Sequence, residues 1–548
     1  MILSNEKLAA KYVTEGVWGR VTLDALLRRN AQGTPGELAL VETDGAGRVT
    51  RSLTYAALEE NVTGLAAFFT SVGLKPDMYV LEQMPIGIDA AIALFGALRA
   101  GLVAVPVSPL LAAAELAAIA ESLGPKALVT SMTSGHGLAE RMRHLAAELF
   151  SVRFVCAFGE AVPDGVVPLD LIIGSGELAD PAAAAALLRN GNAADHVATV
   201  SWSEGSDGPM PLARSHNHWI SAGLMHLVAA RLDKGCRIFS PYLPNGLVGL
   251  AAAVVPWLLT GGTLVLHRFE DVAGLAAAVA ETQPDHVLVP AGLEAPLVAR
   301  LGTLEPSLAL VHPEGGARAR SEWAGGIVDI DRIGDIVAIP RRREHQQADG
   351  SLPLGKIGAM VGTGPVGFLE ARLRGLPRKA GEAADSSFTE GEIILRGPTI
   401  PDAAVPLAEA AAGPAFDADG FLHSGIGGRL VSAEPAGFLP AGPLGDLILV
   451  AGTPVRAAEL DRIYAEHEAV AAAAAVVVPD PVAGTRLRAV IVPQPGRSLD
   501  HADFVRWLVE RGVAAHKIPV GLTLVERLPR TENGRIARTV AVRPARAA

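Results

Sequence analysis

The sequence predicts an α/β protein with a large N-terminal domain of mixed, mostly parallel sheets with flanking helices and a small, mobile α+β domain at the C-terminus. Strand and helix patterns alternate along most of the chain, which is typical of the strand–helix units that build parallel sheets. The length of 548 residues exceeds the usual size of one domain. The C-terminal residues have a strand and helix pattern of their own. We expect the domains to cover residues 1–441 and 442–548.

The first elements follow from the spacing of apolar residues. Residues 22–32 place apolar side chains at helical spacing, and 102–109 is a β-branched run typical of a strand that is covered on both faces. Between them the sequence predicts a strand at 37–43 and a strand edge followed by a helix at 51–74. A further strand is predicted at 79–84 and a further helix at 87–101. This alternation is the pattern of a mostly parallel sheet.

The most apolar segment, 246–266, is interrupted by Pro256, Gly261 and Gly262. It therefore predicts a buried helix, a turn and a buried strand rather than a membrane span. The first residues lack a basic region followed by an apolar stretch, so they do not resemble a signal peptide. We expect a cytoplasmic protein without a membrane partner, present as a monomer or a homodimer.

The C-terminal part contains a smaller set of elements. Short strands are predicted at 391–398 and 444–455, and the Gly/Pro/Ala-rich segment 401–445 between them is an expected inter-domain region. Beyond it the sequence predicts an amphipathic helix at 456–470 and strands at 471–480 and 486–494. A further helix is predicted at 500–513.

Composition and charge exclude several classes of function. Half of the residues are hydrophobic and 19% are charged, which excludes general disorder. The net charge of -11 comes without a basic block, so we expect no nucleic-acid partner. From Pro443 to Ala548 there are 14 Lys and Arg against 11 Asp and Glu, so this end is mildly basic. Cys156 and Cys236 lack the spacing of metal ligands and are expected to be small buried hydrophobes.

Residues 514–538, AAHKIPVGLTLVERLPRTENGRIAR, resemble the C-terminal signature of the adenylate-forming superfamily, which includes acyl-CoA synthetases, nonribosomal peptide adenylation domains and aryl-acid AMP ligases. Further motifs follow in the family's order across nearly the whole chain, among them RSLTYAALEE, EGGARARSE, GEIILRGP and DGFLHSGIGGRL. The opening segment and RSHNHW, residues 214–219, resemble the ligases that load 2,3-dihydroxybenzoate or salicylate onto carrier proteins in siderophore assembly. The resemblance implies the fold stated above and a reaction that joins a carboxylate to AMP.

The superfamily holds the ATP phosphates with a Gly/Ser/Thr loop and a lysine, and SEGSDGPMPL, residues 203–212, stands at that place. Four loop residues are kept: Ser203, Gly205, Ser206 and Gly208. The lysine position is Pro211, and Glu204 and Asp207 add negative charge. A carboxylate about 4 Å from a phosphate oxygen is repelled by about 4 kcal/mol at an effective dielectric constant of about 20. The segment is therefore either a modified binding loop or an ordinary polar surface turn.

Three further positions depart from the ATP contacts that the resemblance implies. Val337 stands where the family has its magnesium-binding glutamate, and valine cannot bind a hard cation. Asp335 lies two residues away, and it replaces the glutamate as a metal ligand only if the turn brings its carboxylate to the metal. Ile426 replaces the ribose-binding aspartate and Pro443 the ribose-binding arginine, so neither side chain pairs with a ribose hydroxyl.

The C-terminal domain keeps part of its implied machinery. Arg535 aligns with the mobile catalytic lysine of the family; it preserves the charge, but its guanidinium is bulkier and planar. Gly445 stands at the position of the hinge, so rotation of the C-terminal domain remains feasible.

The acyl pocket also departs from the aryl-acid branch. Asn245 and Gly246 stand near the histidine–asparagine pair that recognises ring hydroxyls there, which argues against dihydroxybenzoate as the ligand. The implied floor beneath adenine and the acyl group is kept: Gly315, Gly316 and Ala317. His216 is a candidate catalytic residue, although a histidine near a helix start is more often a packing or capping residue.

The replaced residues coincide with four separate ATP contacts, whereas the structural glycines and apolar strands are intact. We therefore expect no ATP or magnesium cofactor, and a repurposed role in natural-product biosynthesis that binds an acyl or aryl small molecule, a carrier protein, or both. Two alternatives stay open. One is an active acid-AMP or thioester ligase with an unconventional ATP and magnesium site, and the other is an ATP-independent acyl-transfer or condensation enzyme.

Overall fold

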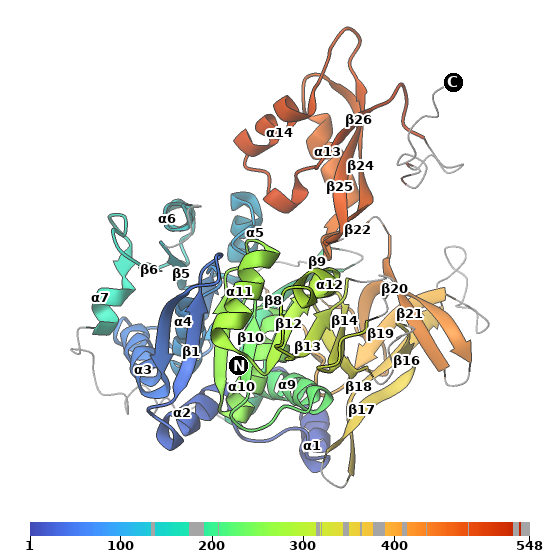
Figure 1. Ribbon diagram of the computed structural model, residues 1–548. Coiled ribbons are helices and arrows are strands. Elements are labelled where there is room, and N and C mark those ends of the chain that lie inside the picture. The colour runs from blue at the N-terminus through green and yellow to red at the C-terminus, as the bar shows by residue number, and fades with distance from the viewer. Residues whose placement is uncertain are drawn as a thin grey trace.

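Figure 1 shows the computed structural model of the chain. The structure describes residues 1–132, 137–174, 191–205, 208–313, 318, 321–343, 350–361, 364–375, 390–407, 414–433, 436–445, 447–480, 482–529, 536 and 538.

Seven strands form the first sheet, in the order β7-β6-β5-β3-β4-β8-β9. Their bounds are Tyr79–Glu82 (β3), Val103–Pro106 (β4), Ala127–Ser131 (β5), Phe154–Phe158 (β6), Val167–Pro168 (β7), Val197–Gly205 (β8) and Gly208–Ser215 (β9). Neighbours run parallel except β8 and β9, which form an antiparallel hairpin.

Helices cover both faces of this sheet, with bounds Tyr55–Ser71 (α3), Ile88–Arg99 (α4), Ala113–Leu123 (α5) and Leu138–Glu148 (α6). Val80 packs in the core that contains α3 and α4, and the next residue, Leu81, packs in the core that contains α5 and α6. This alternation explains why the strand is apolar at consecutive positions.

Eight strands form the second sheet, in the order β15-β14-β13-β12-β10-β11-β1-β2. Their bounds are Leu38–Thr43 (β1), Val49–Thr54 (β2), Arg237–Ser240 (β10), Thr263–His267 (β11), His286–Pro290 (β12), Ser307–Val311 (β13), Ile327–Ile333 (β14) and Val337–Arg342 (β15). The central neighbours are parallel, and the pairs at the two edges are antiparallel.

The other helices of this region are Glu6–Thr14 (α1), Leu23–Gly33 (α2), Leu169–Gly174 (α7), His216–Ala230 (α9), Val255–Thr260 (α10), Val272–Thr282 (α11) and Glu294–Val298 (α12). Segment 246–266 contains a π-helical turn, Gly249–Val254, then α10 and the start of β11, as predicted for a buried helix, turn and strand. Among the described residues, no helix is long and apolar enough to cross a membrane.

Six strands form an antiparallel sheet, in the order β16-β21-β20-β19-β18-β17. Their bounds are Leu352–Pro353 (β16), Gly355–Val361 (β17), Gly364–Gly375 (β18), Glu390–Arg396 (β19), Leu422–Ala433 (β20) and Ala436–Pro443 (β21). The prediction of an inter-domain region at 401–445 was wrong in its second half, because β20 and β21 lie there. Gly428 of β20 serves close packing: a Cβ atom there would lie 2.5 Å from Leu373 Cδ2 and 2.8 Å from Ile393 Cγ1.

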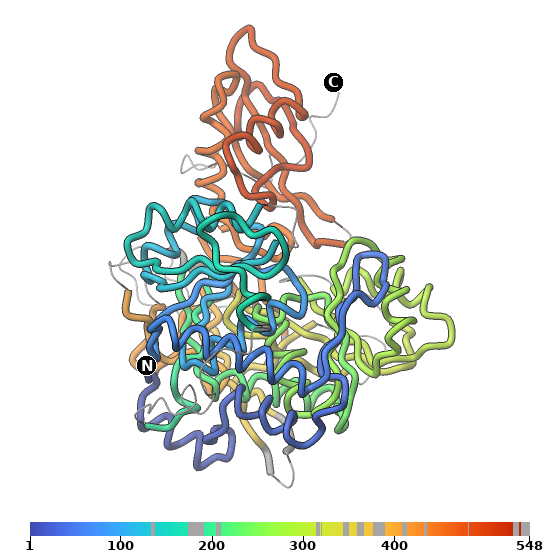
Figure 2. Tube along the Cα trace, turned by 90° about the vertical axis from the view of Figure 1, so that its left-hand side faces the viewer, coloured from blue at the N-terminus to red at the C-terminus, as the bar shows by residue number. Residues whose placement is uncertain are grey.

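The chain from β22 onward stands out from the rest in both views, and we call it the C-terminal lobe (Figures 1 and 2). It contains a hairpin, Leu447–Val450 (β22) with Thr453–Arg456 (β23), and a sheet of Val470–Asp480 (β24), Gly484–Pro493 (β25) and Leu522–Leu524 (β26). Helices Ala457–Ala465 (α13) and His501–Glu510 (α14) supply buried residues to its core.

Two mostly parallel sheets with flanking helices, an antiparallel sheet and a smaller α+β lobe confirm the predicted fold class. The domain limits 1–441 and 442–548 stay a prediction.

Candidate functional site

A cavity of about 820 Å³ lies between the C-terminal lobe and the rest of the chain. We call it the central cavity. Its walls come from the ends of β4 and β8, helix α5, the segment 243–247, and two segments of the lobe, 453–456 and 516–517. The carboxyl ends of parallel strands are the usual place for ligands in α/β proteins, so this cavity is the candidate site.

The segment at the place of the phosphate loop forms the end of the β8–β9 hairpin, where Gly205 pairs with Gly208. Ser203 lines the central cavity, and its hydroxyl accepts a hydrogen bond from the backbone N–H of Asp335 at 3.3 Å. Pro211 is buried in β9 and pairs with Trp202. Ser206 and Asp207, and the side chain of Glu204, lie outside the described residues.

Arg214 fastens this hairpin to the turn between β14 and β15. Its guanidinium donates to the hydroxyl of Ser201 at 2.6 Å and to the backbone carbonyls of Asp335 and Ile336 at 2.6 and 2.7 Å. Burial lowers the pKa of Arg214 to about 10, although the negative charge of Asp335 acts to raise it. Arg214 is thus occupied in holding two backbone segments together.

The residues at two of the replaced ATP contacts lie in an apolar core. Val337 is 2% exposed and Ile426 is fully buried. Both belong to one core cluster with residues from β9 and from the β14–β15 turn, and we call this group the aliphatic cluster: Met210, Leu212, Ile333, Ile336, Val337 and Ile426. Ile426 also pairs with Pro443 across β20 and β21, so the two ribose positions are neighbours in the sheet.

Aliphatic side chains do not fit a magnesium–nucleotide group, because they offer neither oxygen ligands nor hydrogen bonds. Asp335 lines the central cavity, while Val337 points into the core. In the part of the chain that the structure describes, no group of three His, Cys, Asp or Glu is arranged to hold a metal ion.

Asn245 and Gly246, predicted to belong to the acyl pocket, both line the central cavity. The predicted floor residues lie outside the described residues: Gly315, Gly316 and Ala317. The residues on both sides of that floor, however, are held by hydrogen bonds and ion pairs. His312 precedes it directly after β13, and Arg318 follows it.

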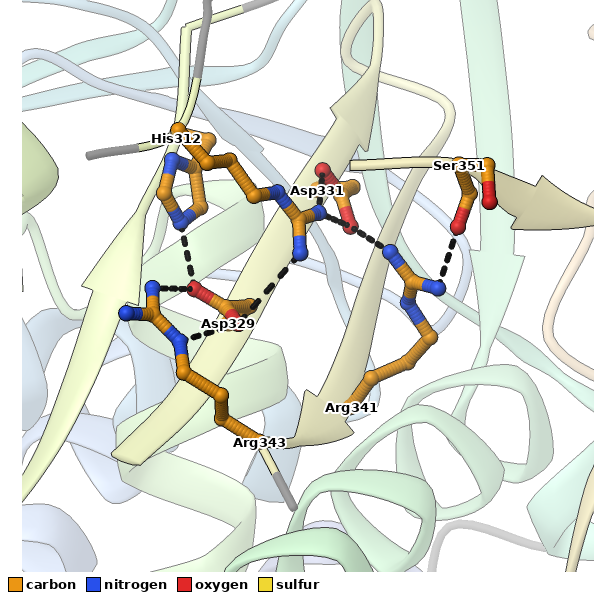
Figure 3. Close-up of polar contacts among 7 residues, drawn as sticks. His312, Asp329, Asp331, Arg341, Arg343 and Ser351 are labelled. Atoms are coloured by element: carbon orange, nitrogen blue, oxygen red, sulfur yellow. Dashed lines mark hydrogen bonds and ion pairs between the residues drawn. The ribbon is translucent and has the colours of Figure 1, made fainter. Parts of the chain in front are cut away.

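A buried ionic network holds these flanks (Figure 3). We call it the Asp329 network, and its members are His312, Arg318, Asp329, Asp331, Arg341, Arg343 and the backbone of Ser351. His312 Nε2 lies 2.6 Å from Asp329 Oδ1, and Arg343 donates to both oxygens of Asp329 at 2.6 and 3.0 Å. Arg318 contacts both Asp329 and Asp331.

Asp329 is 2% exposed, and burial raises its pKa. Hydrogen bonds from His312 and Arg343 and the charge of Arg318 outweigh this effect and hold the pKa well below its usual range. The carboxylate is therefore charged at neutral pH, and it ties His312 and Arg318 to β14.

Of the remaining predicted residues that the structure describes, His216 and Gly445 do not line the cavity. His216 is the first residue of α9, is 1% exposed, and accepts a hydrogen bond on Nδ1 from the backbone N–H of Leu23 at 3.3 Å. Gly445 has a φ of +76° in the turn after β21, which suits glycine. Arg535 lies outside the described residues. The catalytic and hinge roles of these residues stay predictions.

A salt bridge between the lobe and the rest of the chain was not predicted. Lys517 Nζ lies 2.6 Å from Glu115 Oε1 on α5 and 2.7 Å from Glu459 Oε1 on α13. Burial lowers the pKa of Lys517, but hydrogen bonds to the two carboxylates outweigh it and the pKa is raised. The lysine is visible in the sequence, but its partners are distant along the chain, so only the structure brings them together.

We expect the variant Glu115→Gln to loosen the lobe, because it removes one charge of this bridge and keeps the side-chain shape. In the wild type, Glu115 Oε2 also accepts a hydrogen bond from the backbone N–H of Ala112 at 2.9 Å. The side-chain oxygen of glutamine preserves this bond. Small-angle X-ray scattering should show a larger radius of gyration than for the wild type. Glu121→Gln, on the exposed face of the same helix, is the control, and equal radii for all three proteins would contradict the prediction.

Comparison with known proteins identifies the family. The profile of the AMP-binding enzyme family matches residues 27–323, more than half of the chain, and that of the AMP-binding enzyme C-terminal domain matches residues 459–535. The chain belongs to the AMP-binding enzyme family. The resemblance that the motifs indicated is thereby confirmed.

Among relatives in this AMP-binding enzyme family is the salicyl-AMP ligase / salicyl-S-ArCP synthetase of Mycobacterium tuberculosis. It is 30% identical, over 98% of this chain and 93% of the relative. The vibriobactin-specific 2,3-dihydroxybenzoate-AMP ligase of Vibrio cholerae is 26% identical, over 97% of this chain and 95% of the relative. Similarity to aryl-acid AMP ligases therefore extends along the whole chain.

Solved structures agree on the fold of this AMP-binding family member. The apo structure of MbtA from Mycobacterium smegmatis has a TM-score of 0.63 and 24% identity, and 98% of each chain is covered. The amide bond synthetase McbA from Marinactinospora thermotolerans has a TM-score of 0.71 and 21% identity, with 94% of this chain and 98% of the other covered.

Proposed function

We propose that this member of the AMP-binding enzyme family binds an acyl or aryl acid, or its carrier-bound form, in natural-product biosynthesis of the siderophore kind, and does not form an adenylate. The observation that carries the proposal is the aliphatic cluster. Val337 and Ile426, at the metal and ribose positions implied by the resemblance, are buried among apolar side chains. A nucleotide would leave its magnesium and its ribose hydroxyls unpaired there.

The central cavity supports the acyl part of the proposal. Its volume of about 820 Å³ lies within the usual range for small-molecule sites, and its wall combines apolar residues such as Val107 and Leu247 with the polar Asn245. The relatives act on salicylate and 2,3-dihydroxybenzoate by their names, which supports an aryl or acyl acid as the occupant.

A carrier protein is the proposed partner because the C-terminal end is mildly basic, with 14 Lys and Arg against 11 Asp and Glu from Pro443 onward. The name of the relative from Mycobacterium tuberculosis includes the loading of a carrier protein, salicyl-S-ArCP. An acidic carrier would be attracted to such a surface, with an attraction that salt weakens.

Exchange of labelled pyrophosphate into ATP, measured over a panel of aryl and fatty acids, tests the proposal. We expect no exchange with any acid, and no heat of binding when ATP and Mg²⁺ are titrated into the protein. Titration of the same acids without nucleotide should give heat for at least one of them. The salicyl-AMP ligase of Mycobacterium tuberculosis is the positive control under identical conditions.

An active ligase with an unconventional site is the second candidate, favoured by the cationic residues of the lobe. Arg456 and Lys517 line the central cavity, as does Ser203. These groups could replace the lost phosphate lysine from another direction. Exchange with any acid at a rate above the background without enzyme would establish this candidate and refute our proposal.

A further inference from the structure

A second cavity, of about 630 Å³, lies between helix α1 and the antiparallel sheet, and we call it the α1 cavity. In both views α1 lies at the end of the molecule away from the C-terminal lobe (Figures 1 and 2). The α1 cavity and the central cavity share none of the described residues. The α1 cavity is therefore separate from the candidate site, and its wall contains these ionisable side chains: Lys11, Tyr12, Glu15, Lys356, Glu370 and Arg396.

The sheet side of the α1 cavity holds an ionic group in a fixed position. Arg396 of β19 and Arg372 of β18 each donate two hydrogen bonds to the carboxylate of Glu370, at 2.7 to 3.0 Å. Both guanidinium groups also pack on the ring of Phe421, with Cζ 4.3 and 4.4 Å from the ring centroid. Two cations thus share one carboxylate, which leaves a positive charge in excess beside the cavity.

Lys356 of β17 adds a second positive charge. It lies directly opposite Glu370 in the ladder of β17 and β18, so both side chains are on the same face of the sheet. Over the ranges that the structure describes, the ammonium group of Lys356 has neither a hydrogen-bond partner nor an ion-pair partner. Lys11 Nζ, by contrast, lies 3.9 Å from Glu15 Oε1. Two positive charges remain in excess when four cations are set against two carboxylates: Lys11, Lys356, Arg372 and Arg396 against Glu15 and Glu370.

Tyr12 of α1 is 6% exposed and lines the α1 cavity. A buried tyrosine hydroxyl usually has a hydrogen-bond partner. Nowhere in the described ranges does the Tyr12 hydroxyl have one, and it is not fully enclosed by protein atoms, so it opens to the cavity. Burial raises the pKa of Tyr12 to about 12, and the charge of Asp402 acts in the same direction, so the hydroxyl is a donor at neutral pH.

We propose that the α1 cavity is a second binding site, and that it takes an organic anion, a carboxylic acid with an aromatic or aliphatic body. The carboxylate accepts from Lys356 Nζ and from the hydroxyl of Tyr12, the two donors that lack a partner. Tyr12 lies within electrostatic reach of Glu370, the ladder neighbour of Lys356, so the two donors belong to the same part of the wall. Val17 and Leu369 line the cavity as well and supply apolar contacts for the body of the acid.

A fluorine signal at Tyr12 gives the first test, because it reports this cavity and not the central one. 3-Fluorotyrosine replaces the five tyrosines of the full chain, and the ¹⁹F signal of Tyr12 is the one that is missing in Tyr12→Phe. Benzoate, octanoate and 4-phenylbutyrate are titrated beside their uncharged amides. We expect at least one acid to shift the Tyr12 signal to saturation, at a concentration about tenfold lower than its amide. No shift with any of the three acids, or equal concentrations for acid and amide, overturns the inference.

Two variants test the wall of the α1 cavity with the same signal. Lys356→Gln removes one of the two donors and should weaken the binding of the acid about tenfold. Lys7→Gln, which changes an exposed lysine of α1 outside the cavity, is its control and should leave the affinity unchanged. Unchanged affinity in Lys356→Gln overturns the inference.

Gly367 of β18 lines the α1 cavity, and a Cβ atom there would meet no atom within 4 Å. Gly367→Leu should therefore fold, place its side chain in the open space and abolish the shift of the Tyr12 signal. Gly36→Leu, at an equally open glycine outside the cavity, is the control. Wild-type affinity in folded Gly367→Leu would contradict the inference. The proposed function is untouched by either result, since these residues lie outside the central cavity.

Discussion

Ile426→Asp is expected to destabilise the chain by about 4 kcal/mol or more, because it places a charge without a partner in the aliphatic cluster. Ile426 is fully buried in β20 and belongs to the same core cluster as Val337 and Ile336. Urea titration followed by fluorescence should show unfolding at a lower concentration. Ile426→Val, which removes one methylene group, should cost about 1 kcal/mol and is the matched control.

The same variant discriminates between the two candidate functions. An aspartate at this position is what the resemblance implies for ribose binding. If Ile426→Asp is as stable as the wild type and gains affinity for ATP, the cluster opens into a nucleotide pocket and the active ligase is favoured. Loss of stability without ATP binding supports our proposal.

Asp329→Asn is expected to destabilise the chain by about 3–5 kcal/mol, since it removes the negative charge that pairs with Arg318, Arg343 and His312 in a buried network. Urea titration at neutral pH measures the loss. Glu140→Gln, which breaks a half-exposed pair with Arg143, is the control and should change stability by less than about 0.5 kcal/mol. Equal effects of the two variants would contradict a structural role for the network.

The pH dependence of this effect has a definite sign. The pKa of Asp329 is lower in the folded chain than in the unfolded chain, so its contribution to stability is complete above the unfolded pKa of about 3.9 and is lost as the pH falls below it. The difference in stability between the wild type and Asp329→Asn should therefore shrink below about pH 4.

Local patterns predicted most of the fold. The β-branched run at 102–109 indicated a strand covered on both faces, and the structure places Val103 in one core cluster and Ala104 in the other. The prediction of an inter-domain region at 401–445 was wrong in its second half because glycine is typical of loops. Gly428, however, is needed in β20 to let Leu373 and Ile393 approach. Composition does not distinguish a flexible glycine from one required by close packing.

The site was predictable only where a motif marks it. Asn245 was identified from a resemblance, and it does line the central cavity. The partners of Lys517, by contrast, are set by how the lobe sits on α5, which no local pattern encodes.

The aliphatic cluster has an evolutionary consequence. A lineage that acquired a carboxylate at position 337 or 426 one substitution at a time would pass through intermediates with a buried charge and a marginal fold, which selection removes. Under our proposal that the chain does not form an adenylate, a change to nucleotide binding would require concerted replacements on β15, β20 and β21. The packing of these three strands therefore opposes the evolution of a nucleotide site by single substitutions.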